Sequence, residues 1–122
     1  MKLEIKSFGE AGNLEEERLV LHALDDVDIG NYVVLRSKRG ASGTSPTSGS
    51  KDAYWFPDTT VKAGDLVIIY TRKGNSAKKE LSGGRTAHFF YWHKSKPFWS
   101  SDAKNTAVLI ETKTWRSKVP ET

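Results

Sequence analysis

The chain has 122 residues, a formal net charge of +4 and no cysteine. This length suits a single domain with one core, and the lack of cysteine excludes disulfides, thiolate nucleophiles and thiolate metal sites. The first residues alternate polar and apolar side chains, unlike the apolar core of a signal peptide, and no apolar run reaches the length of a membrane span. We therefore expect one cytoplasmic domain over residues 1–122.

The positive charge is concentrated in the middle of the sequence. Residues 1–35 contain 3 Lys and Arg against 8 Asp and Glu, residues 36–104 contain 13 against 5, and residues 105–122 contain 3 against 2. Such a bias can create a basic surface for an anionic partner, although folding can bring the acidic first third beside it and cancel the field. Ordinary solvated loops are the simpler interpretation of the same residues.

The N-terminal third predicts two strands. No segment of the chain has the 3.6-residue period of a long amphipathic helix, and turn signals recur at short intervals. A first strand begins at Leu3 and reaches about Phe8, and a turn over residues 9–13 leads to a second strand over residues 18–23. One face of the second strand is apolar: Leu19, Leu21 and Ala23. We interpret Glu15–Glu17 as an acidic strand edge that discourages edge pairing.

The next segments predict a turn, a strand, an insert and a pair of strands. A turn over residues 25–31 precedes a strand over residues 32–35, and residues 37–52 form a Ser- and Gly-rich insert without large apolar side chains. Because such a segment cannot bury enough surface to order itself, we expect a flexible loop. Residues 60–70 read Thr-Val-Lys-Ala-Gly-Asp-Leu-Val-Ile-Ile-Tyr. Gly64 suits a tight turn there, and Val-Ile-Ile-Tyr favours a buried strand.

The C-terminal part predicts a second flexible polar loop at about residues 72–86, followed by three further segments. In residues 87–93 apolar side chains occur at both odd and even positions, which indicates a central strand covered on both faces. A connection over residues 94–104 leads to a strand over residues 106–110, and residues 114–116 can add a short final strand.

Basic side chains and aromatics supply the candidate binding site. Loops at 36–51, 72–85 and 94–104 carry the candidate residues Arg36, Lys38, Arg39, Arg72, Lys73, Lys78, Lys79, Arg85, Lys94, Lys96 and Trp99. Trp99 lies beside Phe98 in a lysine-rich stretch, a mixture that suits single-stranded nucleic acid or another anionic polymer; packing in the core is the alternative. We expect the remaining large aromatics to pack in the core: Trp55, Phe89, Phe90, Tyr91 and Trp92.

The sequence gives no pattern for an enzyme, a metal or a cofactor. His88 and His93 are five residues apart, which on a strand places them on opposite faces. They are therefore unsuited to bind one metal ion together. The Asp26-x-Asp28-x-Gly30 run lacks the later ligands of a calcium loop. There is neither a Gly-x-Ser-x-Gly elbow nor a glycine-rich phosphate loop. We expect a protein that is not an enzyme and binds no metal or cofactor.

Several motifs in order resemble the lamin tail domain over about residues 3–116. They are Ile29-Gly30-Asn31-Tyr32, Phe56-Pro57, the Thr-Val-Lys-Ala-Gly-x-x-Val-x-Ile-Tyr phrase at 60–70, Trp92, Trp99 and Ala107–Ile110. The resemblance implies an immunoglobulin-like β-sandwich of two packed antiparallel sheets, and it matches Trp99 to a structural tryptophan. Nuclear lamins also have a coiled coil, a basic tail and a lipidated cysteine. The given sequence has none of these features, so we expect a free-standing, bacterial-type relative.

The family resemblance implies a binding module without shared catalytic residues, and it leaves the partner open. Lamin-tail-like domains have proposed partners among nucleic acid, chromatin proteins and membrane-associated proteins. Three hypotheses follow from the residues: a protein-interaction module, which we favour, a nucleic-acid binder that uses the basic loops, and a carbohydrate binder that uses exposed aromatics. Salt separates the first two, because counterion release makes nucleic-acid affinity fall steeply with salt.

Overall fold

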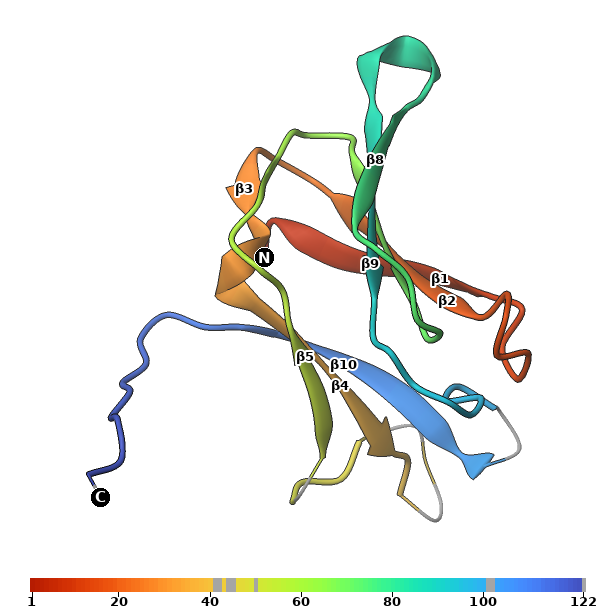
Figure 1. Ribbon diagram of the computed structural model, residues 1–122, viewed down its shortest axis with the longest axis vertical. Coiled ribbons are helices and arrows are strands. Elements are labelled where there is room, and N and C mark those ends of the chain that lie inside the picture. Colours follow the sequence, from red (N-terminus) through yellow and green to blue (C-terminus); the bar gives the residue numbers. More distant parts are fainter. Residues whose placement is uncertain (41–42, 44–45, 50, 101–102, 122) are drawn as a thin grey trace.

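The protein is built from short β-strands, as expected. A computed structural model describes residues 1–40, 43, 46–49, 51–100 and 103–121 (Figure 1). The strands in this part of the chain are β1 (Leu3–Gly9), β2 (Arg18–Ala23), β3 (Val27–Asp28), β4 (Tyr32–Lys38), β5 (Asp52–Trp55), β6 (Thr60–Val61), β7 (Leu66–Tyr70), β8 (Ala77–Glu80), β9 (Thr86–Tyr91) and β10 (Asn105–Glu111). Two short 3-10 turns, η1 (Ile29–Asn31) and η2 (Ser82–Gly84), complete the described elements.

The strands form a five-stranded, a three-stranded and a two-stranded sheet. Their orders are β1-β2-β7-β9-β8, β10-β4-β5 and β3-β6. The two larger sheets lie as separate layers, and the β8–β9 hairpin projects from one end (Figure 1). One expectation was wrong: β7 and β9 are parallel, so the larger sheet is mixed instead of antiparallel. The reason is that β8 reverses the chain and pairs antiparallel with β9, which places β9 between β7 and β8.

The hydrophobic core is formed by side chains from both larger sheets. On β2 the expected face is confirmed, since Leu19, Leu21 and Ala23 are all fully buried. Val67 and Ile69 of β7 and Phe90 of β9 join the same cluster, and from the three-stranded sheet come Tyr32 and Val34 of β4. Each fully buried aliphatic side chain contributes roughly 1.5–3 kcal/mol relative to exposure.

The turn between β6 and β7 is confirmed. Gly64 has a φ of +90°, in the region that favours glycine. Its N–H donates to the Ala23 carbonyl (2.8 Å), and the Ala23 N–H donates to the Asp65 carbonyl (2.9 Å). The turn is therefore bonded to the end of β2, and it places the Asp65 side chain in the interior, where it is buried.

Both expected loops contain regular structure. In the first, β4 extends to Lys38 and β5 starts at Asp52. Ser37 is buried, and its hydroxyl donates to the Thr47 carbonyl (2.9 Å). Residues 41–42, 44–45 and 50 of this expected loop lie outside the described part. In the second, β8 and η2 lie within residues 72–86. The strand β8 forms because Ala77–Glu80 can complete its backbone hydrogen bonds along the free edge of β9.

The aromatic side chains differ from the expected core set in three places. Trp55 is 52% exposed, because its position on β5 faces away from the core. Phe89 and Tyr91 are half-buried on the outer face of β9, where Tyr91 stacks on Tyr70 with ring centroids 5.5 Å apart. Residues 87–93 are thus covered fully on one side only, and the strand ends at Tyr91. Residues 114–116 do not form a strand.

Within the described residues, every helical segment is too short to cross a lipid bilayer.

Candidate functional site

An ion-paired centre forms where β4, β5 and the segment after β9 meet. Arg36 and Asp52 are register partners on β4 and β5. The Arg36 Nη2 atom lies 3.5 Å from Asp52 Oδ2, and the Lys94 Nζ atom lies 3.2 Å from Asp52 Oδ1. One carboxylate therefore holds two cations that are 58 residues apart in the sequence, and all three side chains stay about one-third to one-half exposed.

The ring of Phe98 forms the floor of this centre. The Arg36 guanidinium carbon is 4.0 Å from the Phe98 ring centroid, and Lys94 Nζ is 5.2 Å from it. Arg36 also donates from Nη1 to the Phe98 carbonyl (3.3 Å). A guanidinium over an aromatic face is attracted by the ring quadrupole, so Phe98 helps to fix the position of the charge while remaining buried itself.

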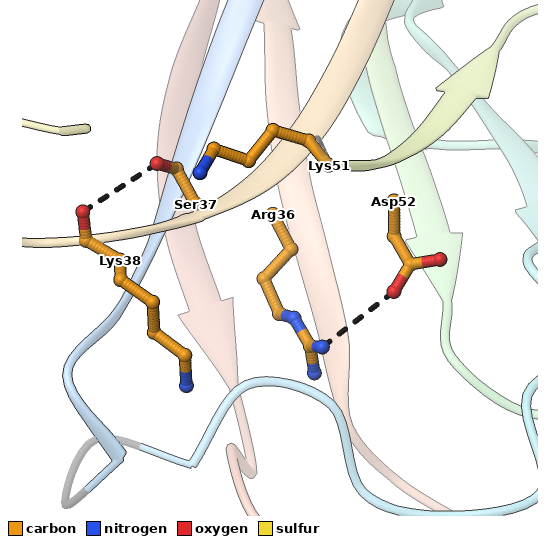
Figure 2. Close-up of a pocket in the computed structure, with 5 residues that line it drawn as sticks. All are labelled: Arg36, Ser37, Lys38, Lys51 and Asp52. Carbon is orange, nitrogen blue, oxygen red and sulfur yellow. Dashed lines mark hydrogen bonds and ion pairs between the residues drawn. The ribbon is translucent and has the colours of Figure 1, made fainter. Parts of the chain in front are cut away.

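Two hollows share the Arg36–Asp52 pair in their lining. The first has a volume of about 300 Å³ and is lined by Arg36, Ser37, Lys38, Lys51 and Asp52 (Figure 2). The second, also about 300 Å³, is lined by Arg36, Asp52, Lys94, Ser95, Lys96, Pro97 and Phe98. We refer to the cations of the two hollows as the basic cluster: Arg36, Lys38, Lys51, Lys94 and Lys96. These hollows contain five cationic side chains and one carboxylate.

Two of the lysines are held in place by neutral acceptors. Lys38 donates from Nζ to the Ala103 carbonyl (2.8 Å) and to Asn105 Oδ1 (2.7 Å). Lys51 donates from Nζ to the Ser48 carbonyl (3.2 Å). Neutral acceptors orient an ammonium group without cancelling its charge, so the basic cluster keeps a net positive charge that a bound anion could neutralise.

The segment that carries Phe98 is anchored by Glu17, a residue with an unexpected role. Glu17 is fully buried, and its carboxylate accepts hydrogen bonds from the N–H groups of Gly12 (2.8 Å), Phe98 (2.8 Å) and Trp99 (3.0 Å). The Thr71 hydroxyl donates to the same carboxylate. The interpretation of Glu17 as part of an acidic strand edge was therefore wrong, because four donors make burial of this carboxylate favourable.

The structure brings together four of the predicted site residues and separates the others. Arg36, Lys38, Lys94 and Lys96 lie in the basic cluster, and the Arg39 N–H donates to the Lys104 carbonyl (3.0 Å) next to it. The other predicted cations belong to different elements: Arg72 and Lys73 follow β7, Lys78 and Lys79 lie on β8, and Arg85 precedes β9. Lys51 was not predicted, although it directly precedes Asp52.

Trp99 belongs to the core. It is only 3% exposed, and its ring contacts Phe98, Trp92 and Phe8 at centroid distances of 5.1, 6.1 and 5.2 Å. Of the two interpretations of Trp99, the structure supports packing. A base cannot stack on a buried ring, so Trp99 offers no stacking surface to single-stranded nucleic acid.

The histidines are used in separate contacts. His88 and Asp65 are both buried, and His88 Nε2 lies 3.0 Å from Asp65 Oδ2, whereas His93 Nε2 lies 3.0 Å from the Gly74 carbonyl. Burial raises the pKa of Asp65, but hydrogen bonds from the Lys62 N–H, His88 and the Thr86 N–H outweigh it, so the pKa lies below its usual value. No cluster of three or more potential metal ligands occurs among the described residues.

No protein-family model and no curated protein was found to match this chain.

Proposed function

We propose that this protein is a non-catalytic interaction module whose basic cluster binds an acidic segment of a partner protein. The observation that carries the proposal is that five cations from three chain segments line two hollows whose described lining includes one carboxylate, Asp52. Asp52 is shared between Arg36 and Lys94, so a carboxylate from a partner can complete the pairing of either one. Acidic side chains offer the bidentate geometry that the guanidinium of Arg36 prefers.

A protein partner is favoured over nucleic acid because the described residues that line the two hollows include no exposed aromatic ring. Phe98, the aromatic residue that lines the second hollow, is buried. Phosphate contacts alone would still allow weak, sequence-independent binding of nucleic acid. The two ligands therefore belong in the same experiment.

We also propose the finer assignment of the fold as an immunoglobulin-like β-sandwich of the lamin-tail type. Two packed sheets, the glycine turn at residues 62–65 and the core position of Trp99 support this proposal. The parallel β7–β9 pair is a departure from a purely antiparallel sandwich. A scaffold of this kind supports many functions, so the binding proposal depends on the basic cluster and not on the fold.

The test compares two double variants that change the net charge equally. Lys51→Glu with Lys96→Glu reverses two charges in the basic cluster, and Lys78→Glu with Lys79→Glu reverses two charges on β8. Fluorescence anisotropy is measured with a labelled polyglutamate peptide and a labelled single-stranded oligonucleotide at low salt. We expect the cluster variant to weaken peptide binding at least about tenfold, since close charge pairs contribute a kcal/mol or more each, and the β8 variant to retain most of the affinity.

Three results would contradict the proposal. Equal loss in both variants would mean that total charge, and not the cluster, determines binding. Binding of the oligonucleotide alone would favour the nucleic-acid hypothesis. Failure of the wild-type protein to bind either polymer at low salt would remove the basic cluster as a site for anionic polymers.

A further inference from the structure

Two tryptophans contact each other on the surface at the end of β5 that is opposite Asp52. Trp55 and Trp115 are 52% and 61% exposed. Their ring centroids are 5.1 Å apart, and the ring planes meet at 82°. Tryptophan is the side chain with most to gain from burial, so a pair that stays exposed at one place indicates a binding surface.

The η1 turn holds the Trp55 indole and anchors the chain shortly before Trp115. The Trp55 Nε1–H donates to the Gly30 carbonyl at 2.7 Å. The Asn31 carbonyl accepts from both the N–H (2.8 Å) and the hydroxyl (3.0 Å) of Thr112. Thr112 directly follows β10, so this double hydrogen bond fixes the path of the chain three residues before Trp115. Backbone acceptors of η1 thus anchor one ring directly and the chain that leads to the other ring.

A carboxylate shares the pocket with the two rings. The pocket has a volume of about 420 Å³, and the residues that line it include Asn31, Trp55, Pro57, Asp58 and Trp115. A Cβ atom on Gly30 would lie 2.0 Å from Asp58 Oδ1, so a glycine at this position is what admits the carboxylate. Within the described part of the chain, no cationic side chain forms an ion pair with Asp58.

We propose that Trp55, Trp115 and Asp58 form a site for a methylated ammonium group. The face of an indole ring is the strongest cation–π partner among side chains, and two perpendicular rings offer two walls to one compact cation. Asp58 supplies the counter-charge. A methylated ammonium loses less hydration than the strongly hydrated ammonium of lysine, so it enters an aromatic corner more readily.

The geometry of the two rings favours a methylated ammonium over a carbohydrate, the ligand that we first associated with exposed aromatic residues. A sugar ring stacks across a flat aromatic platform, whereas two indoles at 82° form a corner. The unpaired carboxylate also favours a cation over a neutral ligand. This site shares no lining residue with the basic cluster, so the two proposals stand or fall independently.

The experiment titrates the full chain with choline and with its neutral analogue, in which a tert-butyl group replaces the trimethylammonium. Binding is followed by tryptophan fluorescence and by the NMR shifts of the indole N–H groups. We expect saturable binding of choline, with the neutral analogue weaker by at least about threefold. Trp115→Ala and the isosteric Asp58→Asn should each weaken choline binding about three- to thirtyfold, and Lys6→Glu, at an exposed position on β1, should leave it unchanged.

Thermal unfolding verifies that each variant is folded. If Trp115→Ala fails to fold, Asp58→Asn carries the comparison, because it changes the charge and keeps the shape. Equal affinity for choline and the neutral analogue would overturn the cation proposal, and so would unchanged binding in Asp58→Asn. Saturation by maltose or cellobiose without binding of choline would replace the proposed cation with a carbohydrate.

Discussion

The carboxylate of Glu17 accepts hydrogen bonds from three backbone N–H groups and one hydroxyl, which belong to three separate segments of the chain. Two donors, the N–H groups of Gly12 and Trp99, face Oε1, while the Phe98 N–H and the Thr71 hydroxyl face Oε2. All of these donors are satisfied only while both oxygens remain acceptors. The side chain therefore connects the loop before β2, the end of β7 and the floor of the basic cluster.

Replacing Glu17 with Gln tests this arrangement with almost no change of shape. The new amide group must present its N–H₂ to one pair of donors, and each buried donor left unpaired costs about 1–3 kcal/mol. We expect a loss of roughly 2–5 kcal/mol in the free energy of unfolding, measured by urea titration. Glu16→Gln is the matched control, because Glu16 is exposed. Equal midpoints for the two variants would show that the Glu17 carboxylate is not needed.

Asp65 predicts how stability depends on pH. Burial raises its pKa, but the donors around it outweigh this and the pKa lies below its usual value. A carboxyl whose folded pKa is depressed stabilises the protein above its unfolded pKa, near 4, and this contribution is lost as pH falls through the folded value. The urea concentration at the unfolding midpoint should therefore decrease as the pH is lowered below about 4. This decrease should be less steep in Asp65→Asn than in the wild-type protein. Parallel curves for the two proteins would contradict this assignment.

At the scale of elements, strands with an internal signal were predictable from the sequence. On β2, Leu19, Leu21 and Ala23 at every second position mark the buried face. The continuous Leu-Val-Ile-Ile-Tyr run marks β7 as a buried strand, and Gly64 marks the turn between β6 and β7. The strand β8 has the sequence Ala-Lys-Lys-Glu, with all four residues exposed. It has no buried face to reveal it, and only its hydrogen bonds to β9 make it a strand.

The candidate site was predictable only in part, for a related reason. A count of charges identified Arg36, Lys38, Lys94 and Lys96, but it cannot tell which loops meet in space. The register of β4 with β5 decides that Arg36 faces Asp52, and register depends on tertiary pairing. Within Glu15–Glu17 the residue types are identical, so no local pattern shows that the third one is buried.

Trp92 follows β9 and connects three elements through ring contacts. Its ring lies 4.6 Å from Phe98, 6.1 Å from Trp99 and 5.7 Å from Tyr54, measured between centroids. Because the side chain is partly buried, Trp92→Ala should lower the free energy of unfolding by about 2–4 kcal/mol, near the lower end for aromatic truncations.

Trp115→Ala provides the comparison for Trp92→Ala, since Trp115 is mostly exposed. Surface substitutions usually change stability by about 0.5 kcal/mol or less. Urea unfolding of both variants measures the difference. If the two urea midpoints coincide, the ring contacts of Trp92 stabilise the protein no more than those of a surface tryptophan, which would contradict this prediction.

At the scale of the whole molecule, the acidic first third does not neutralise the basic cluster. Glu17 is buried under its own hydrogen bonds, Asp26 pairs with Lys62, and Glu4 pairs with His22. Among the described residues, the carboxylate that contacts the cluster is Asp52, from the middle of the sequence. The charge asymmetry of the sequence is therefore preserved in the folded protein at this end of the two sheets.

This charge distribution limits how strongly salt can weaken binding at the basic cluster. Each phosphate neutralised on a single strand contributes about −0.7 to the slope of log affinity against log salt. Five cations then give a slope no steeper than about −3.5, which corresponds to a loss of about a hundredfold between 50 and 200 mM salt. Anisotropy titrations with an oligonucleotide at several salt concentrations measure the slope directly. A steeper slope that becomes shallower in the Lys78→Glu, Lys79→Glu variant would show that β8 also contacts the polymer, and that the anionic surface is wider than the basic cluster.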